Sequence, residues 1–147
     1  MPGGPAMAAI LGVSGLVIGS FLGLASLRLP TGRDIVFGRS RCGGCGAPLT
    51  PQHMVPVVSY LCLGGRCGRC RSVIPARYPL IELAAAVVGA VAGATLSSPL
   101  AAGLAALSGW LGILSVVLLV EHRRAPHVLG AMLLLSIVAT AVAARAT

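Results

Sequence analysis

The sequence is poor in charged residues, and acidic side chains are its scarcest feature. Only 10% of the 147 residues are charged, and Asp34, Glu82 and Glu121 are the only three carboxylates. Lysine is absent, because all eleven basic residues are arginine. A chain with 56% hydrophobic residues and so little charge lacks the polar surface of a water-soluble domain. We therefore expect an integral membrane protein whose chemistry has few carboxylates to use.

Aromatic residues are also rare, at 3% of the chain. Proteins that bind single-stranded nucleic acid combine a basic groove with aromatic side chains on which the bases stack. No such aromatic surface accompanies the arginines, so the net charge of +8 does not indicate a nucleic-acid partner. Arginines near the ends of membrane helices instead favour anionic headgroups, and membrane lipid is the partner that the composition predicts.

Long apolar runs are abundant. Four runs carry no charge or a single one: Ala6–Leu27, Pro79–Leu96, Pro99–Val120 and Val128–Ala144. The first run has 22 residues, which as a helix span about 33 Å and exceed a hydrocarbon core of about 30 Å. The sequence therefore predicts an all-α integral membrane protein with about four transmembrane helices.

The arginine positions predict how these helices are oriented. Eight of the eleven arginines lie between the first two runs, and Arg123 and Arg124 lie between the last two. Because basic residues concentrate in cytoplasmic loops, we expect both loops in the cytoplasm and both termini outside. No basic residue precedes the first run and Arg28 follows it, so we expect this helix to stay in the mature protein. The expected division is residues 1–28 for the first helix, 29–78 for a loop and 79–147 for three further helices.

Two Cys-x-x-Cys pairs interrupt the apolar sequence within the first loop. Cys42 and Cys45 are separated by 21 residues from Cys67 and Cys70, a spacing typical of a structural four-thiolate zinc site in a ribbon-like loop. The alternative is two structural disulfides, which an oxidising compartment would favour. The cytoplasmic location expected for the loop favours zinc. Cys62 stands apart in an apolar stretch and is expected to be a buried thiol.

Small residues recur at every fourth position on the first two expected helices. The two stripes are Gly15, Gly19 and Gly23, and Ala85, Gly89 and Gly93. Such stripes let helix backbones approach closely in lipid, so they predict a tightly packed bundle.

Glu82 lies near the start of the second apolar run. A carboxylate at this position can reach water or a basic partner such as Arg77, or it can serve a function within the membrane. Both interpretations stay open on the sequence.

Four segments together resemble a known family. They are GSFLGLASLRLP (Gly19–Pro30), IVFGRSRCGGCGAPL (Ile35–Leu49), VPVVSYLCLGGRCGRC (Val55–Cys70) and ARYPLIEL (Ala76–Leu83). In this order they are similar to the amino-terminal half of bacterial type IV prepilin peptidases. The resemblance implies a transmembrane helix, a cytoplasmic zinc-ribbon loop and the start of a second helix, in the bacterial inner membrane.

The resemblance also implies an activity. Members of this family are membrane aspartic peptidases that cleave the leader of type IV prepilins and pseudopilins. They also methylate the new amino terminus with S-adenosylmethionine. The resemblance therefore implies prepilin or pseudopilin leader peptides as partners, and S-adenosylmethionine as a cofactor beside structural Zn²⁺.

The motifs that carry the family's peptidase chemistry are incomplete in this sequence. That chemistry needs two carboxylates close together, one to activate water and one to protonate the carbonyl. No Gly-x-Gly-Asp occurs. Glu121, five residues before Pro126, is the nearest match to the first catalytic position, and Glu82 belongs to the segment that the resemblance links to methylation. Glu121 and Glu82 are therefore the two catalytic candidates.

Two hypotheses about function follow. Under the first, the chain takes part in leader cleavage and N-methylation, with a companion chain that carries the missing aspartates. Under the second, it is a non-catalytic membrane scaffold whose zinc ribbon binds a partner of the pilus or secretion machinery. The family resemblance favours the first hypothesis, whereas the scarcity of carboxylates favours the second.

Overall fold

The computed structural model of the chain describes residues 4–32, 40–122 and 127–145, and within them it is helical with no β-strand. The α-helices are α1 (Pro5–Arg28), α2 (Val58–Cys62), α3 (Arg77–Thr95), α4 (Pro99–His122) and α5 (His127–Arg145). Two short 3₁₀ turns are η1 (Leu29–Thr31) and η2 (Pro51–Met54). Asp34, Arg123, Arg124 and Pro126 lie outside the described residues.

The predicted fold class is confirmed. α1, α3 and α4 are long and apolar enough to cross a membrane, and α5 contains a shorter apolar stretch, Leu133–Val142. α3 begins at Arg77, two residues before the apolar run that predicted it. Pro79, the first residue of that run, lies within the first turn of the helix. Backbone N–H groups of a first turn have no partner within the helix, so a proline costs little there.

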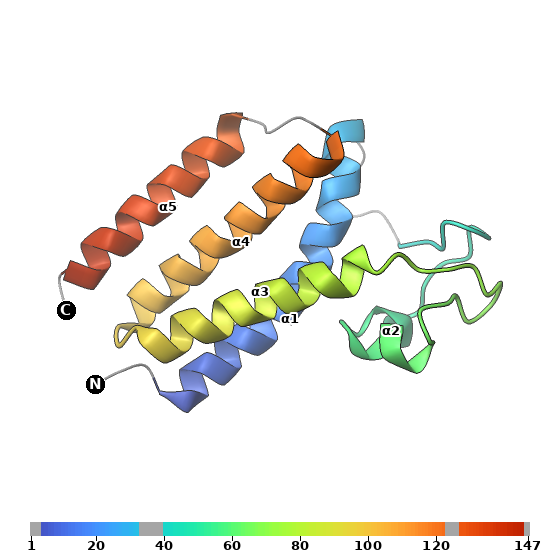
Figure 1. The fold of residues 1–147 in the computed structure, drawn as a ribbon, viewed down its shortest axis with the longest axis horizontal. Coiled ribbons are helices and arrows are strands. Elements are labelled where there is room, and N and C mark those ends of the chain that lie inside the picture. The colour runs from blue at the N-terminus through green and yellow to red at the C-terminus, as the bar shows by residue number, and fades with distance from the viewer. Residues whose placement is uncertain (1–3, 33–39, 123–126, 146–147) are drawn as a thin grey trace.

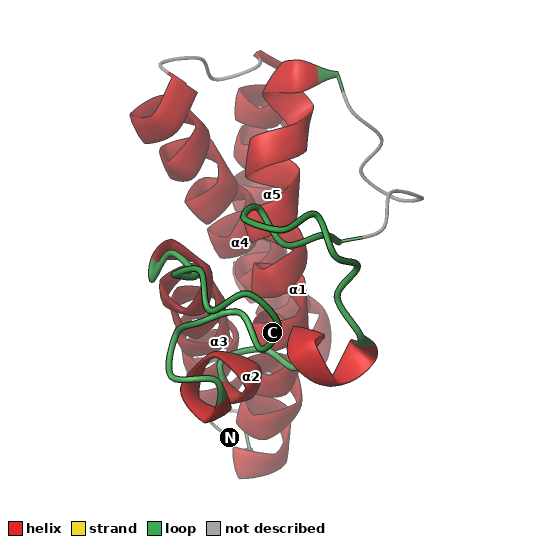
Figure 2. Ribbon diagram, turned by 90° about the vertical axis from the view of Figure 1, so that its right-hand side faces the viewer, coloured by secondary structure: helices red, strands yellow, loops and turns green. Residues whose placement is uncertain are grey.

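The long helices form a bundle in which neighbours along the chain run in opposite directions (Figure 1). α1 packs along α3, α4 packs against both, and α5 packs against α4. α1 begins and α5 ends at the same end of the bundle. The start of α3, the short helix α2 and the cysteine-bearing loop lie together, and Figures 1 and 2 both show α2 beside the first turns of α3.

Small residues allow α1 and α3 to approach with their backbones in contact. A methyl group added at Gly15 would overlap the carbonyl of Ala85, and one added at Gly89 would overlap the carbonyl of Leu11. A Cβ added at Gly93 would also lie too close to backbone, 2.6 Å from the carbonyl oxygen of Met7. The two small-residue stripes therefore lie in the α1–α3 interface, in agreement with the tightly packed bundle that they predicted, and van der Waals contact between backbones holds this interface.

The bundle has a small apolar core. The side chains on its outer faces are also largely apolar, but they are exposed. Trp110 is buried on α4, and its indole N–H donates a 2.9 Å hydrogen bond to the carbonyl of Ala85. Val13, Val17 and Val87 are about 60% exposed on the outer faces of α1 and α3. Such surfaces suit lipid rather than water.

We predict that Gly15→Ala destabilises the bundle by about 1–3 kcal/mol, because the added methyl group forces α1 away from α3. Gly103→Ala is the matched control, since nothing lies within 4 Å of a Cβ at that position of α4. The control should be neutral or slightly stabilising, because alanine favours a helix over glycine. Unfolding in mixed micelles with increasing dodecyl sulfate measures both. Equal unfolding midpoints for the two variants would contradict the interface described here.

Candidate metal centre and the polar contacts beside it

The first Cys-x-x-Cys pair lies in a compact turn. The Cys42 N–H donates to the Ala47 carbonyl at 2.9 Å, and the Gly46 N–H donates to the Cys42 carbonyl at 2.9 Å. Gly46 has φ +67°, a conformation that favours glycine. The Gly44 N–H donates to Cys42 Sγ at 3.4 Å, and Arg41 donates from its guanidinium to the Gly46 carbonyl.

The second pair repeats this construction 25 residues later. The Cys67 N–H donates to the Ser72 carbonyl at 2.8 Å, and the Arg71 N–H donates to the Cys67 carbonyl at 2.9 Å. Arg71 occupies the position of the glycine in the first turn and also has a positive φ, +61°. Arg66 donates to the Arg71 carbonyl. The two turns are thus a structural repeat in which an arginine before each first cysteine closes its own turn.

The four sulfurs of Cys42, Cys45, Cys67 and Cys70 lie within 4.8 Å of one another. The Sγ atoms of Cys42 and Cys70, one from each turn, are 3.7 Å apart. Tetrahedral Zn–S bonds of about 2.3 Å place sulfurs about 3.8 Å apart, whereas a disulfide requires about 2.05 Å. All five cysteines are free thiols. The arrangement can hold a metal ion and does not match two bonded pairs.

Ser72 lowers the pKa of two thiols of the cluster. Its hydroxyl lies 3.1 Å from Cys70 Sγ and 3.4 Å from Cys42 Sγ. Hydrogen bonding with Ser72 is the main reason that the pKa of Cys42 is lowered to about 5, and it also lowers the pKa of Cys70. The Ala47 N–H favours a Cys45 thiolate, but hydrogen bonding to Cys70 and the charge of Cys42 raise the pKa of Cys45 to about 11. Ser72 therefore favours the thiolate form of Cys42 and Cys70, and the thiolate is the form that binds metal.

Cys62 is not part of this cluster. The expectation of a buried thiol was wrong, because Cys62 is exposed at the end of α2. An apolar sequence neighbourhood predicted burial within the protein, whereas this short helix turns part of its apolar surface outward.

Glu82 connects α3 to the loop that carries the cysteines. Its side chain is buried, with 7% of the residue exposed, and its Oε2 accepts a 2.7 Å hydrogen bond from the Val57 N–H. Val57 has φ +59°, which is strained for a β-branched residue. Gly19 makes room for this arrangement, because a Cβ there would lie 2.6 Å from the Cα of Glu82. Glu82 therefore contacts the backbone of the loop. The guanidinium of Arg77 binds other groups of the chain.

Arg77 instead joins α1, α3 and α4. Its guanidinium forms an ion pair with Glu121 and donates to the Ser26 hydroxyl at 2.7 Å and to the Gly23 carbonyl at 3.4 Å. His122 Nε2 lies 3.0 Å from the Ser26 carbonyl oxygen. The Arg77 and Glu121 side chains are 26% and 24% exposed. The sequence offered no local signal for this cluster, because its members lie far apart along the chain.

Neither catalytic candidate has an unengaged carboxylate. Glu82 binds a backbone N–H and Glu121 binds Arg77. The catalytic roles of both residues stay predictions.

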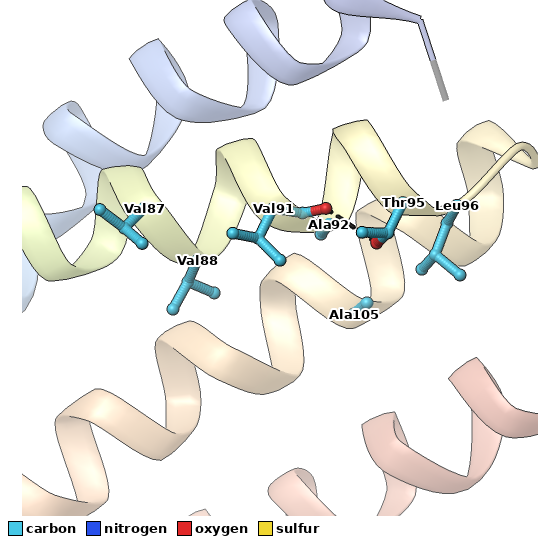
Figure 3. A pocket seen from close by; sticks show the side chains of 7 residues that line it. All are labelled: Val87, Val88, Val91, Ala92, Thr95, Leu96 and Ala105. Atoms are coloured by element: carbon cyan, nitrogen blue, oxygen red, sulfur yellow. Dashed lines mark hydrogen bonds between the residues drawn. The ribbon is translucent and has the colours of Figure 1, made fainter. Parts of the chain in front are cut away.

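A groove between α3 and α4 has none of these polar groups in its lining (Figure 3). Its lining is Val87, Val88, Val91, Ala92, Thr95, Leu96 and Ala105. The Thr95 hydroxyl donates to the Val91 carbonyl at 2.8 Å. With no titratable side chain in its lining, the groove can pack against lipid or another helix but offers no acid or base.

Comparison with known proteins matches the chain to one family. The family described as the bacterial peptidase A24 N-terminal domain matches residues 13–96. The chain is 45% identical over 85 residues to a prepilin leader peptidase/N-methyltransferase of Myxococcus xanthus, covering 56% of this chain and 25% of the relative. A protein of the same name from Pseudomonas aeruginosa is 33% identical over 139 residues, covering 78% of this chain and 48% of the relative. No solved structure matches.

The matched region includes α3 and all four clustered cysteines, but it is only part of the relatives. The chain spans between 25% and 48% of the length of the two relatives named above, and 35% of a Bacillus subtilis protein of the same name that is 39% identical.

We predict that the purified protein carries about one equivalent of zinc and that Cys67→Ser removes most of it, because three remaining thiolates bind zinc less tightly. Cys62→Ser is the matched control and should keep the metal, since Cys62 lies outside the cluster. Elemental analysis after gentle purification measures both. Less than about half an equivalent in the unmodified protein, or equal loss in the two variants, would contradict a four-thiolate site.

Proposed function

The chain belongs to the bacterial A24 peptidase family of prepilin leader peptidases, and from this premise we propose that it acts in the processing of type IV prepilins or pseudopilins. Its role there is that of a membrane module that carries the metal-binding loop. The N-methyltransferase activity in the names of its relatives extends the proposal to methylation of the cleaved amino terminus, with S-adenosylmethionine as methyl donor.

The observation that carries this role is that both described carboxylates, Glu82 and Glu121, are bonded to other groups of the chain. Leader cleavage by an aspartic mechanism needs two carboxylates free to activate water and to protonate the substrate carbonyl. In the part of the chain that the structure describes, Glu82 is held by the Val57 N–H and Glu121 by Arg77. Both contacts join separate segments of the fold. We propose that they organise the module, and that the aspartate pair comes from a companion chain.

Zinc is the metal that fits the cluster best. Four thiolates in two tight turns are the donor set of structural zinc sites, which are four-coordinate and closed to water. Arg41, Arg66, Arg69 and Arg71 are exposed, and each directly precedes or follows a cysteine of the cluster in sequence, so their positive charges can offset the negative charge of a metal-bound cluster. The role proposed for the metal is to hold the loop folded. The arginine-rich loop is proposed to face the cytoplasm of a bacterial inner membrane, with both termini outside.

A scaffold without a part in catalysis is the second candidate, and the engaged carboxylates favour it too. The two candidates differ in whether cleavage by a companion requires this chain.

Leader cleavage separates them. Membranes holding the chain, a companion that carries Gly-x-Gly-Asp, or both are given a prepilin, and the shortened pilin is measured by gel mobility and mass spectrometry. We expect cleavage by the pair only. Glu121→Gln keeps an oxygen acceptor for Arg77 and should leave the rate of cleavage within about twofold of the unmodified pair. Cys67→Ser removes most of the metal and should reduce the rate of cleavage at least about tenfold.

Three outcomes would contradict the proposal. Cleavage by the chain alone would show that it carries its own catalytic groups. Loss of cleavage in Glu121→Gln, at unchanged protein level and metal content, would make Glu121 a catalytic residue. Cleavage by the companion that is the same with and without this chain would support the scaffold.

A further inference from the structure

An uncharged apolar surface lies on the loop that carries the metal centre. Residues 50–65 contain no Asp, Glu, Lys or Arg. Large apolar side chains on this segment are exposed, with Leu61 at 69% and Val58 at 54%. We call the surface formed by Met54, Val55, Val58, Leu61 and Cys62 the α2 face. Large exposed apolar side chains gathered within residues 54–62 of a small loop indicate a surface that is covered by lipid or by another protein.

The depth of this segment follows from its bond to α3. The 19 residues of α3 span about 28 Å, no more than a hydrocarbon core of about 30 Å, so a membrane-spanning α3 has Arg77 at the edge of the core. Glu82 lies five residues further along, about 7 Å inside that edge. Its carboxylate is 2.7 Å from the Val57 N–H. Val57, the residue that precedes α2, is therefore held beside the first turns of α3, near the edge of the hydrocarbon core, and not beyond the end of the helix. Figures 1 and 2 show α2 next to these turns.

The charges around the α2 face fit a lipid surface. The exposed arginines Arg41, Arg66, Arg69 and Arg71 belong to the two cysteine turns on either side of residues 50–65. Segments that lie in a membrane interface place apolar side chains at the boundary between headgroups and acyl chains and keep basic groups near anionic headgroups. An apolar face flanked by arginine has this pattern.

We propose that the α2 face is a membrane-docking surface that lies in the headgroup–acyl boundary of the bilayer. Val58 and Leu61 enter the lipid, and the bond between Glu82 and Val57 sets the depth. The metal centre is then held against the membrane surface instead of extending into water. The proposal requires that α3 spans a membrane and does not depend on a role in prepilin processing.

Tryptophan fluorescence tests the depth of the α2 face. Trp110 is the only tryptophan, so Trp110→Phe gives a silent background for Leu61→Trp. Two reference positions are Val87→Trp, exposed near the middle of α3, and Gly43→Trp, at a cysteine turn where nothing lies within 4 Å of a Cβ. The zinc-loaded full chain is reconstituted into vesicles of phosphatidylethanolamine and phosphatidylglycerol. Quenching by acyl-chain brominated lipid is compared with quenching by acrylamide.

We expect Leu61→Trp to be quenched by brominated lipid at a depth shallower than Val87→Trp, and to resist acrylamide more than Gly43→Trp. Acrylamide quenching equal to that of Gly43→Trp, without quenching by brominated lipid, would overturn the proposal in favour of water. Protection from both quenchers would overturn it in favour of a protein partner or a second copy of the chain.

The unmodified chain provides a second measurement that does not depend on the variants. It is irradiated in the same vesicles with a diazirine carried on the lipid acyl chain. Trypsin then releases residues 42–66 as one peptide, since no Lys or Arg lies between Arg41 and Arg66. We expect lipid adducts on residues 54–62 and none on residues 42–48. Absence of adducts from 54–62, in a sample where α3 is labelled, would refute membrane docking.

Discussion

The hydrogen bond between the Glu82 carboxylate and the Val57 N–H is the contact on which the arrangement of membrane bundle and metal loop depends. A buried carboxylate is costly unless its oxygens are hydrogen-bonded. Here the Val57 amide donates to Oε2 of Glu82 at 2.7 Å, and Val57 has φ +59°. The strain persists because the surrounding contacts determine the conformation. As a result, the loop between α1 and α3 has a fixed attachment to a transmembrane helix.

The other described carboxylate, Glu121, also connects separate parts of the fold. In a chain with three carboxylates, the two that are described each join different parts of the fold. Glu121 on α4 meets Arg77 on α3, and Arg77 also reaches Ser26 on α1. Glycines at the α1–α3 interface bring the backbones close enough for these polar groups to meet at one end of the bundle. The polar residues thus stabilise the end of the bundle from which the cysteine loop begins.

Regular local patterns let the sequence predict most of the fold. Apolar runs located the long helices, the fourfold spacing of Gly15 and Gly19 located a helix interface, and the paired Cys-x-x-Cys motifs identified the sulfur cluster. These features depend on spacing, which a single sequence displays. The repeat of an arginine before each first cysteine was also visible, and it could have predicted two equivalent turns.

Contacts between distant residues could not be predicted in this way. Glu121 lies 44 residues after Arg77, and no periodicity links them. The positive φ of Val57 was unexpected, because a β-branched residue rarely adopts it without an external constraint. Cys62 was predicted buried because its neighbours are apolar, yet an apolar surface in a membrane protein can also face lipid.

Amide exchange at Val57 tests the central claim most directly. In the zinc-loaded protein in lipid nanodiscs, the account predicts that the Val57 amide exchanges slowly with deuterium. Glu82→Ala should expose that amide to fast exchange, while the metal content stays unchanged and amides near the middle of α4 stay protected. A Val57 amide that exchanges equally fast with and without the Glu82 carboxylate would contradict the claim that this bond fixes the loop to the membrane bundle.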